Sequence, residues 1–287
     1  MKLASYERQG KAAYGVVIGD RAYDLGEEPD SIKQALARGP GWMQDRAREV
    51  TAGGDGGWAL ADISFLPVVP DPAKIICFGL NYADHRDEAQ RETTNYPPVF
   101  FRFADTQIGH SRPAIKPATS EMFDYEGELA VVIGRPCRSV PEADAMQAVA
   151  GYSCYNDLSA RDWQMHTSQW GPGKNFPGTG AFGPWLVTPD EIPDPSVLHL
   201  ATRVNGELRQ SASLKDLLFP IPALISYVSG FTPLGIGDVL VTGTPSGVGL
   251  FREPPAFLHA GDQVEVEISE VGTLANVVAA EAGHAPR

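Results

Sequence analysis

FDYEGELAVVIG, residues 123–134, joins an acidic pair to an apolar run that is typical of a buried β-strand. Glu126 and Glu128 are two residues apart, so in a strand both side chains project from the same face. Two close carboxylates repel each other, and a bound cation is the usual remedy. Asp157 ends a second predicted strand and would supply a third oxygen, giving a donor set that suits Mg²⁺ or Mn²⁺.

A simpler interpretation of these acidic residues stays open from the pattern alone. Glu126 and Glu128 would then lie on a solvated strand edge, and Asp157 would cap the turn before Ser159 and Arg161. Single short motifs match by accident often enough that neither residue pattern identifies a metal site by itself.

Around this segment the chain alternates short apolar runs with fewer helical patterns. Residues 74–79, 128–134, 151–159, 237–243 and 262–269 are predicted strands, the last with a clear period of two. Residues 81–92 and 141–149 are predicted helices, and 216–231 is predicted as a helix broken near Pro222. Residues 71–287 therefore indicate a mostly β domain of the α+β class.

The first 70 residues are predicted to form a separate small α/β unit. Residues 3–25 contain short strands separated by turns, and SIKQALARG (31–39) has a helical pattern that stops at glycine. A Gly-rich loop at 51–59 and a Pro-rich connector at 65–74 follow, and the connector suits an extended junction between domains.

Composition limits the classes of partner. The chain has 287 residues and a formal net charge of −13, which argues against nucleic acid because phosphate binding needs clustered basic residues. Three cysteines without paired spacing indicate neither a disulfide framework nor a zinc motif. We find no signal-peptide pattern and no run of about 20 apolar residues, so a cytoplasmic protein without a membrane partner is expected.

Two further segments contain candidate catalytic groups. In NYADHRDE, His85 and Glu88 have the i, i+3 spacing of neighbours on a helix, which would let the carboxylate orient the imidazole as a general base. In GPGKNFPGTGAFGPW, Lys174 is the one cation of a Gly-rich loop and would neutralise an enolate oxygen. The alternatives are a surface ion pair for the first segment and an exposed lysine in a turn for the second.

VTGTPSGVG, residues 241–249, follows a predicted strand. Its backbone N–H groups and the Thr244 hydroxyl are candidates to hold a substrate carboxylate. It lacks the GKS/T ending of a nucleotide-binding loop, and a tight strand-to-turn connection explains it equally well.

Taken in order, these segments resemble the fumarylacetoacetate hydrolase family from about Lys74 to about Val278. The segments that carry the resemblance are CFGLNYADH, PPVFFRFADTQIGH, DYEGELAVVIG, NDLSARDWQ, GKNF, VNGELRQ, FTPLGIGDVLVTGTPSGVG and HAGDQVEVEISEVGTLAN. Each alone is weak, but their joint order is very unlikely to arise by accident.

The resemblance implies a β roll of mixed sheets, usually in a homodimer, with a small appended N-terminal unit. It implies that Glu126, Glu128 and Asp157 bind Mg²⁺ or Mn²⁺, with Ca²⁺ also used in the family. The implied catalytic residues are His85 and Glu88 on a lid segment and Lys174. The implied substrate-binding residues are Tyr82, Arg102, Arg161 and Thr244.

Two departures from the common family pattern matter. Arg102 stands where many relatives have lysine, and a planar guanidinium would meet a different anion there than an ammonium does. GKNFP replaces the more common GKSFD, so Pro177 removes a carboxylate expected in the pocket. Both departures weaken any direct transfer of a relative's substrate.

The resemblance implies an enzyme acting on a small 2-oxo acid. The leading hypothesis is C–C hydrolysis of an acylpyruvate such as fumarylpyruvate or maleylpyruvate in aromatic or sugar-acid breakdown. His85 would activate water, and Lys174 together with the cation would stabilise the departing pyruvate enolate. Decarboxylation of oxaloacetate and isomerisation or hydration of a 2-hydroxydienoate use the same enolate stabilisation. A non-catalytic, metal-stabilised binding protein is the alternative from another class.

Overall fold

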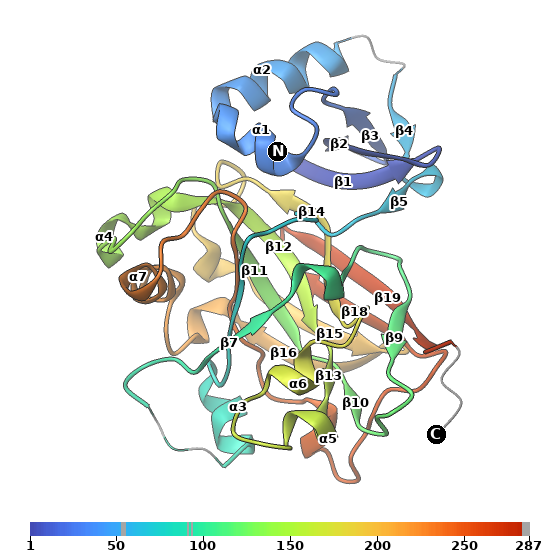
Figure 1. Cartoon of the computed structure of the whole chain (residues 1–287), viewed down its shortest axis with the longest axis vertical. Coiled ribbons are helices and arrows are strands. Elements are labelled where there is room, and N and C mark those ends of the chain that lie inside the picture. Colours follow the sequence, from blue (N-terminus) through green and yellow to red (C-terminus); the bar gives the residue numbers. More distant parts are fainter. Residues whose placement is uncertain (53–55, 91, 93, 283–287) are drawn as a thin grey trace.

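The computed structural model describes residues 1–52, 56–90, 92 and 94–282. Figure 1 shows how its helices and strands are arranged. A 12-stranded mixed sheet passes through the whole molecule. Its order is β4 (Trp58–Ala59), β3 (Arg21–Asp24), β2 (Lys11–Ile18), β1 (Lys2–Arg8), β14 (Gly180–Val187), β12 (Val149–Asp157), β11 (Gly127–Ile133), β17 (Val239–Val241), β6 (Ile75–Phe78) and β7 (Val99–Arg102), with β5 (Ser64–Phe65) beside β1 and β8 (Gln107–Ile108) beside β14.

A second sheet of five strands covers one face of the large sheet. Its order is β16 (Glu207–Ser213), β15 (His199–Val204), β18 (Gln263–Ile268), β19 (Gly272–Ala280) and β9 (Ala114–Lys116), and a separate pair joins β10 (Phe123–Asp124) to β13 (Ser159–Ala160). In β18 the valines and Ile268 are buried while Gln263 and Glu267 are exposed, as the period of two predicts. Pairs such as β17–β6 are parallel and most others antiparallel, so the predicted mixed, mostly β fold is confirmed.

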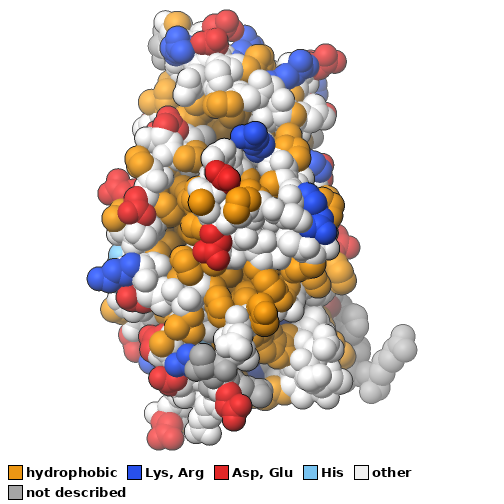
Figure 2. Space-filling view, turned by 90° about the vertical axis from the view of Figure 1, so that its left-hand side faces the viewer, with side chains coloured by type: hydrophobic (Ala, Val, Ile, Leu, Met, Phe, Trp, Pro, Cys, Tyr) orange, Lys and Arg blue, Asp and Glu red, His pale blue; other side chains and the backbone are white. Residues whose placement is uncertain are grey.

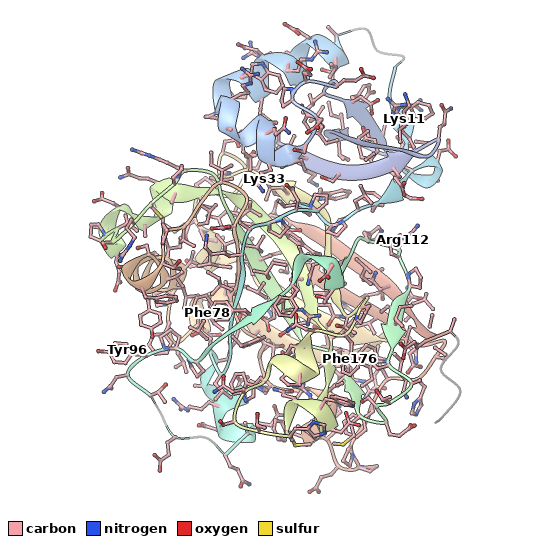
Figure 3. All side chains as sticks on the ribbon, viewed as in Figure 1. Lys11, Lys33, Phe78, Tyr96, Arg112 and Phe176 are labelled. Atoms are coloured by element: carbon pink, nitrogen blue, oxygen red, sulfur yellow. The ribbon has the colours of Figure 1, made fainter. Side chains whose placement is uncertain are left out.

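β11 is buried on both faces, which explains its uninterrupted apolar sequence. Leu129, Val131 and Ile133 pack into the core between the two sheets. Ala130 and Val132 pack on the opposite side, in a core shared with β1, β2 and β6. Side chains fill the space between these layers (Figure 3). The acidic residues at the start of β11 are therefore attached to a strand that is packed on both faces.

Helices pack beside the sheets, and α1 (Ile32–Arg38) and α7 (Ile221–Phe231) contribute buried side chains to their cores. Further helices are α2 (Pro40–Thr51), α3 (Ala83–Glu88), α4 (Glu142–Ala145), α5 (Arg161–Gln164) and α6 (Gly171–Lys174). The predicted break near Pro222 is wrong, because Pro222 lies in the first turn of α7, where a missing N–H costs nothing. The helix predicted over 81–92 is shorter, and α2 was not predicted. Among the described residues no helix is both long and apolar enough to cross a membrane.

The N-terminal residues form the end of the molecule drawn in blue in Figure 1. Ser31 caps α1 by accepting the N–H of Gln34, and Gly39 ends that helix with φ +90°, as its pattern predicts. β1 also pairs with β14, with Leu3 opposite Leu186, so the large sheet continues across the predicted boundary at residue 70. Part of the predicted loop at 51–59, residues 53–55, lies outside the described residues.

The face that carries α4 and α7 exposes patches of hydrophobic side chains between scattered charged groups (Figure 2). Tyr96 is 67% exposed and stacks on Tyr227 of α7, with ring centroids 5.7 Å apart. Phe231, at the end of α7, packs edge-on against the same tyrosine. The expected homodimer stays a prediction.

Candidate active site

The structure brings together the three carboxylates that the sequence singled out. Glu126 immediately precedes β11, Glu128 is its second residue, and Asp157 is the last residue of the paired strand β12. One carboxylate oxygen from each residue lies within 4.8 Å of the others, and all three side chains are buried. The oxygens of two adjacent strand ends thus converge on one point.

Three basic side chains surround the carboxylates. Lys174 Nζ lies 2.7 Å from Glu126 Oε2 and 2.7 Å from Asp157 Oδ2. Arg161 pairs with the other oxygen of Glu126, and Arg102 pairs with the other oxygen of Asp157. Lys174 is only 1% exposed, which excludes the interpretation of this residue as an exposed turn lysine.

Glu128 differs from the other two carboxylates because no cationic side chain of the described residues pairs with it. Its Oε2 accepts only the backbone N–H of Gly243, at 2.5 Å. Burial, and then the carboxylates of Asp157 and Glu126, raise its pKa well above the usual value. Burial would also raise the pKa of Glu126, but Lys174 and Arg161 outweigh burial and lower it to about 2.

This donor set fits a hard divalent cation. Carboxylate oxygens are the ligands that Mg²⁺ and Mn²⁺ prefer, and the buried Glu128 lacks the positive partner that its neighbours have. The arrangement supports divalent metal binding without fixing which ion is used.

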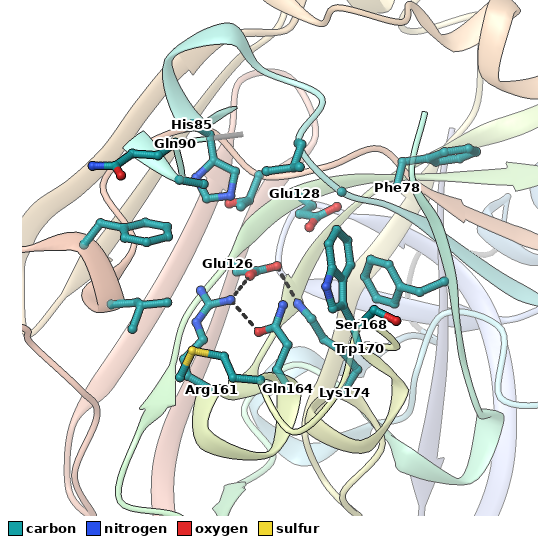
Figure 4. Close-up of a pocket in the computed structure, with 18 of the residues that line it drawn as sticks. Phe78, His85, Gln90, Glu126, Glu128, Arg161, Gln164, Ser168, Trp170 and Lys174 are labelled. Atoms are coloured by element: carbon teal, nitrogen blue, oxygen red, sulfur yellow. Dashed lines mark hydrogen bonds and ion pairs between the residues drawn. The ribbon is translucent and has the colours of Figure 1, made fainter. Parts of the chain in front are cut away.

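A cavity of about 780 Å³ opens above the carboxylates (Figure 4). Its floor is polar and its walls include aromatic rings, the mixture expected for a small-molecule site. Of the predicted site residues, His85, Glu126, Glu128, Arg161, Lys174 and Thr244 line it.

His85 and Glu88 lie on α3 at the mouth of this cavity. The His85 Nδ1 atom is 3.2 Å from Glu88 Oε2, and the histidine is only 7% exposed. Figure 4 shows the imidazole above the Glu126 and Glu128 carboxylates. A hydrogen bond from Nδ1 to the carboxylate leaves Nε2 as the basic nitrogen. The pair is therefore not a solvated surface ion pair.

Several backbone N–H groups in the loop after β17 donate to protein carboxylates and are therefore not free to bind a ligand. The amides of Gly243 and Gly247 donate to Glu128 and Glu88, and those of Gly249 and Leu250 donate to Asp124. Thr244 lines the cavity, but its hydroxyl donates to the carbonyl of Gly127 at 3.0 Å and accepts from Gln210 Nε2 at 2.8 Å. The expectation that amides of residues 241–249 bind a substrate carboxylate is therefore wrong for Gly243, Gly247 and Gly249, because protein acids already accept their N–H groups.

Three further predictions are corrected by position. Arg102 is buried behind Asp157 and does not line the cavity, so its guanidinium meets a protein carboxylate instead of a substrate anion. Tyr82 also lies outside the lining and packs in the apolar core, which leaves its predicted substrate contact without support. Pro177 is exposed and outside the lining, so the carboxylate that it replaces would not have faced this cavity.

Sequence reasoning missed several lining residues. Gln164 lies one helical turn after Arg161 on α5, and its Oε1 accepts from Arg161 Nη1 at 3.0 Å. Trp170 forms part of the wall and packs edge-on against Phe100. The i, i+3 spacing from Arg161 was a signal for Gln164, but nothing in the sequence indicated Trp170.

Comparisons with known proteins agree with the fold. The profile described as fumarylacetoacetate (FAA) hydrolase C-terminal matches residues 74–279. A mitochondrial oxaloacetate tautomerase of Xenopus laevis is 41% identical over 92% of this chain and 83% of its own length. The structure of a fumarylacetoacetate hydrolase from Exiguobacterium antarcticum has a TM-score of 0.85 at 36% identity, covering 98% of this chain and 100% of that chain.

A third relative is known with small molecules bound. The structure of maleylpyruvate hydrolase from a Sphingobium species, in complex with manganese(II) ion and pyruvate, has a TM-score of 0.81 at 31% identity and covers 98% of this chain and 99% of that chain. By their names these relatives are enzymes, of more than one reaction type. The matched profile spans most of the chain, and this protein belongs to the fumarylacetoacetate hydrolase family.

Proposed function

We propose that this protein catalyses keto–enol tautomerisation of a short 2-oxo dicarboxylic acid, oxaloacetate above all, with Mg²⁺ or Mn²⁺ as cofactor. The observation that carries the proposal is a histidine oriented by Glu88 over the same cavity that Glu126, Glu128 and Lys174 line. The 41% identity to an oxaloacetate tautomerase, against 31% to a maleylpyruvate hydrolase, supports this reaction over the hydrolysis that the sequence motifs favoured.

Glu126 and Glu128, which line the cavity, would hold the cation together with Asp157, which is buried beside them and outside the lining. When bound there, the cation would polarise the 2-oxo group and stabilise the enolate formed from it. The carboxylates are fixed by β11 and β12, so the site would be preorganised before substrate arrives.

His85 is the base that moves the proton. With Nδ1 bonded to Glu88, its Nε2 would take a proton from the carbon next to the 2-oxo group, leaving an enolate. Return of that proton to the enolate oxygen gives the enol, and the reverse sequence gives the ketone. No water, oxidant or other reactant is consumed.

Lys174 contributes a fixed positive charge and not a base. Burial lowers the pKa of Lys174, but the Asp157 and Glu126 carboxylates outweigh burial and raise it above its usual value. The side chain therefore stays an ammonium beside the oxygen on which charge develops.

Arg161 is placed to bind a substrate oxygen. Its Nε and Nη1 are committed to Asp124 and Glu126, whereas its buried Nη2 has no hydrogen-bond partner among the described residues. A buried donor without a partner is costly unless a ligand satisfies it, and this side chain lines the cavity. A carboxylate of the substrate would supply the missing acceptor.

Acylpyruvate hydrolysis is the second candidate. The relative bound to manganese and pyruvate matches nearly the whole chain, and the same His85 would take its proton from water instead of carbon. Oxaloacetate decarboxylation needs only the enolate stabilisation and no attacking water.

A substrate panel with Mn²⁺ or Mg²⁺ distinguishes these reactions. We expect enol-oxaloacetate to lose its enol absorbance faster with protein than without, and with no release of pyruvate or CO₂. Fumarylpyruvate and maleylpyruvate would be assayed in parallel for pyruvate release. Efficient pyruvate release from an acylpyruvate, together with unaccelerated oxaloacetate tautomerisation, would reject the proposal in favour of hydrolysis.

A further inference from the structure

Asn175 follows Lys174 at the end of α6 and reaches the edge of β7, the last strand of the large sheet. Its Oδ1 accepts the backbone N–H of Phe103 at 2.8 Å, and its Nδ2 donates to the carbonyl of Phe101 at 3.0 Å. These two backbone groups flank Arg102 and are the groups that a neighbouring strand would bind. The amide side chain thus takes the place of a strand where β7 ends.

Arg102 carries this constraint to the carboxylates. Its Nη1 donates to Asp157 Oδ1 and to the carbonyl of Leu158, and its Nη2 donates to Thr179 Oγ1 at 2.7 Å. Asp157 Oδ2 is held from the other side by Lys174, at 2.7 Å. Each oxygen of Asp157 is therefore bound by one cation, of which one is attached to β7 and the other to α6.

Asn175 is the direct link between these two attachments. It is the residue after Lys174, and its side chain binds the backbone on both sides of Arg102. A shift of α6 against β7 would move the two cations apart and rotate the carboxylate between them. Arg102 and Asn175, which both depart from the common family pattern, are thus joined through the end of β7.

We propose that Asn175 is a positioning residue, which sets the distance between Lys174 and Arg102 and thereby the orientation of Asp157 toward a bound divalent cation. The inference rests on the metal site of the proposed function and is independent of which reaction follows. Outer partners of metal ligands commonly change metal affinity when they are lost, because the ligand is no longer preorganised.

The test is the affinity of the full chain for Mn²⁺, measured by titration calorimetry after chelator treatment and without substrate. Asn175→Ala is expected to raise the Kd by up to about 10-fold, the lower end of the range for loss of a group bonded directly to a ligand, because Asn175 acts through Lys174 and Arg102. Asn276→Ala is the matched control, because Asn276 is buried and its Nδ2 donates to two carbonyls, those of Gly109 and Arg112, at 3.0 and 2.7 Å. Its Kd should stay within about twofold of the parent.

A double-mutant cycle tests whether the two residues act as one unit. Arg102→Lys should weaken Mn²⁺ binding, and adding Asn175→Ala to it should cost less than Asn175→Ala costs in the parent. If Asn175→Ala does not fold, as judged by circular dichroism, Asn175→Asp replaces it, since aspartate keeps the acceptor for Phe103 and loses both amide donors.

The inference is overturned if the alanine or aspartate variant binds Mn²⁺ as tightly as the parent. It is also overturned if Asn276→Ala weakens binding equally, or if the parent binds no Mn²⁺. A parent that binds Mn²⁺ but does not tautomerise oxaloacetate contradicts the proposed function and leaves this inference standing.

Discussion

Gly247 donates its backbone N–H to both carboxylate oxygens of Glu88, at 3.2 and 3.3 Å. Glu88 in turn holds Nδ1 of His85, so the position of the base depends on the loop after β17. In the same loop, the Gly243 amide donates a hydrogen bond to Glu128. One turn therefore holds the base and a metal carboxylate in fixed relation to each other.

Replacing His85 tests the assignment of the base. His85→Ala should lower kcat for tautomerisation by about 10²–10⁴-fold, the usual contribution of a general base. Glu88→Gln should lower it less, because an amide oxygen still accepts from Nδ1 but stabilises the imidazolium less well. Both variants should bind Mn²⁺ like the parent, as neither residue belongs to the carboxylate cluster. A His85→Ala variant with parental kcat would exclude the proposed role.

Replacing Glu128 tests the metal site without depending on catalysis. Glu128→Gln keeps the shape of the side chain and removes the carboxylate that lacks a cationic partner. We expect Mn²⁺ to bind at least about 100-fold more weakly, beyond the effect of losing an outer-shell partner. The melting temperature in chelator should stay the same or rise, because the substitution removes repulsion from Glu126 and Asp157.

Comparison with the parent in excess Mn²⁺ completes this experiment. The parent should melt at a higher temperature with Mn²⁺ than in chelator, since a ligand that binds only the folded state stabilises it. Equal Mn²⁺-dependent shifts for the parent and for Glu128→Gln would show that Glu128 is not a ligand.

Strand periodicity predicted a mostly β domain and a shared face for Glu126 and Glu128, whereas the β roll of mixed sheets and the complete metal cluster were implied by the family resemblance. Leu129 to Ile133 must be buried on both faces, and residues two apart in a strand share a face, so Glu126 and Glu128 had to lie together. The adjacency of Asp157 was implied by the resemblance alone, because the pairing of β11 with β12 is a long-range contact that no local pattern specifies.

Other parts of the molecule depend on contacts that the sequence does not show. Lys174 lies in a Gly- and Pro-rich segment without periodicity, so its burial between Glu126 and Asp157 could not be read from its neighbours. α2 was missed because Met43 is its one buried residue, too few to give a helical pattern. The local pattern also placed Pro222 correctly in a helix but did not show that it lies in the first turn.

Gly79 leaves the space in which the aromatic wall of the cavity is packed. A Cβ atom on Gly79 would lie 2.3 Å from Trp170 Cζ3, so Gly79→Ala must displace the indole. We expect KM for oxaloacetate to rise with a smaller change in kcat, because the wall and not the base is moved. Gly171→Ala is the matched control, since a Cβ there meets no atom of the described part of the chain within 4 Å. Steady-state kinetics in which KM changes equally in both alanine variants would contradict this role for Trp170.

His110 should make stability depend on pH far from the carboxylates. Burial lowers its pKa, its Nδ1 accepts the N–H of Ala275 at 3.1 Å, and its ring packs edge-on against Phe65. Below about pH 6.5 the imidazole of the unfolded chain binds a proton more readily than the buried imidazole of the folded chain does. The stability that the neutral imidazole contributes is therefore fully present above about pH 6.5 and is lost as the pH falls.

His110→Gln should flatten that dependence, because a glutamine oxygen accepts the same N–H without titrating. The measurement is urea unfolding in chelator between pH 7 and 5, where the parent's free energy of unfolding should fall more steeply than the variant's. The exposed His259 provides the control, and His259→Gln should keep the parental slope. Identical slopes for the parent and for His110→Gln would mean that the buried imidazole is protonated as easily in the folded chain as in the unfolded one.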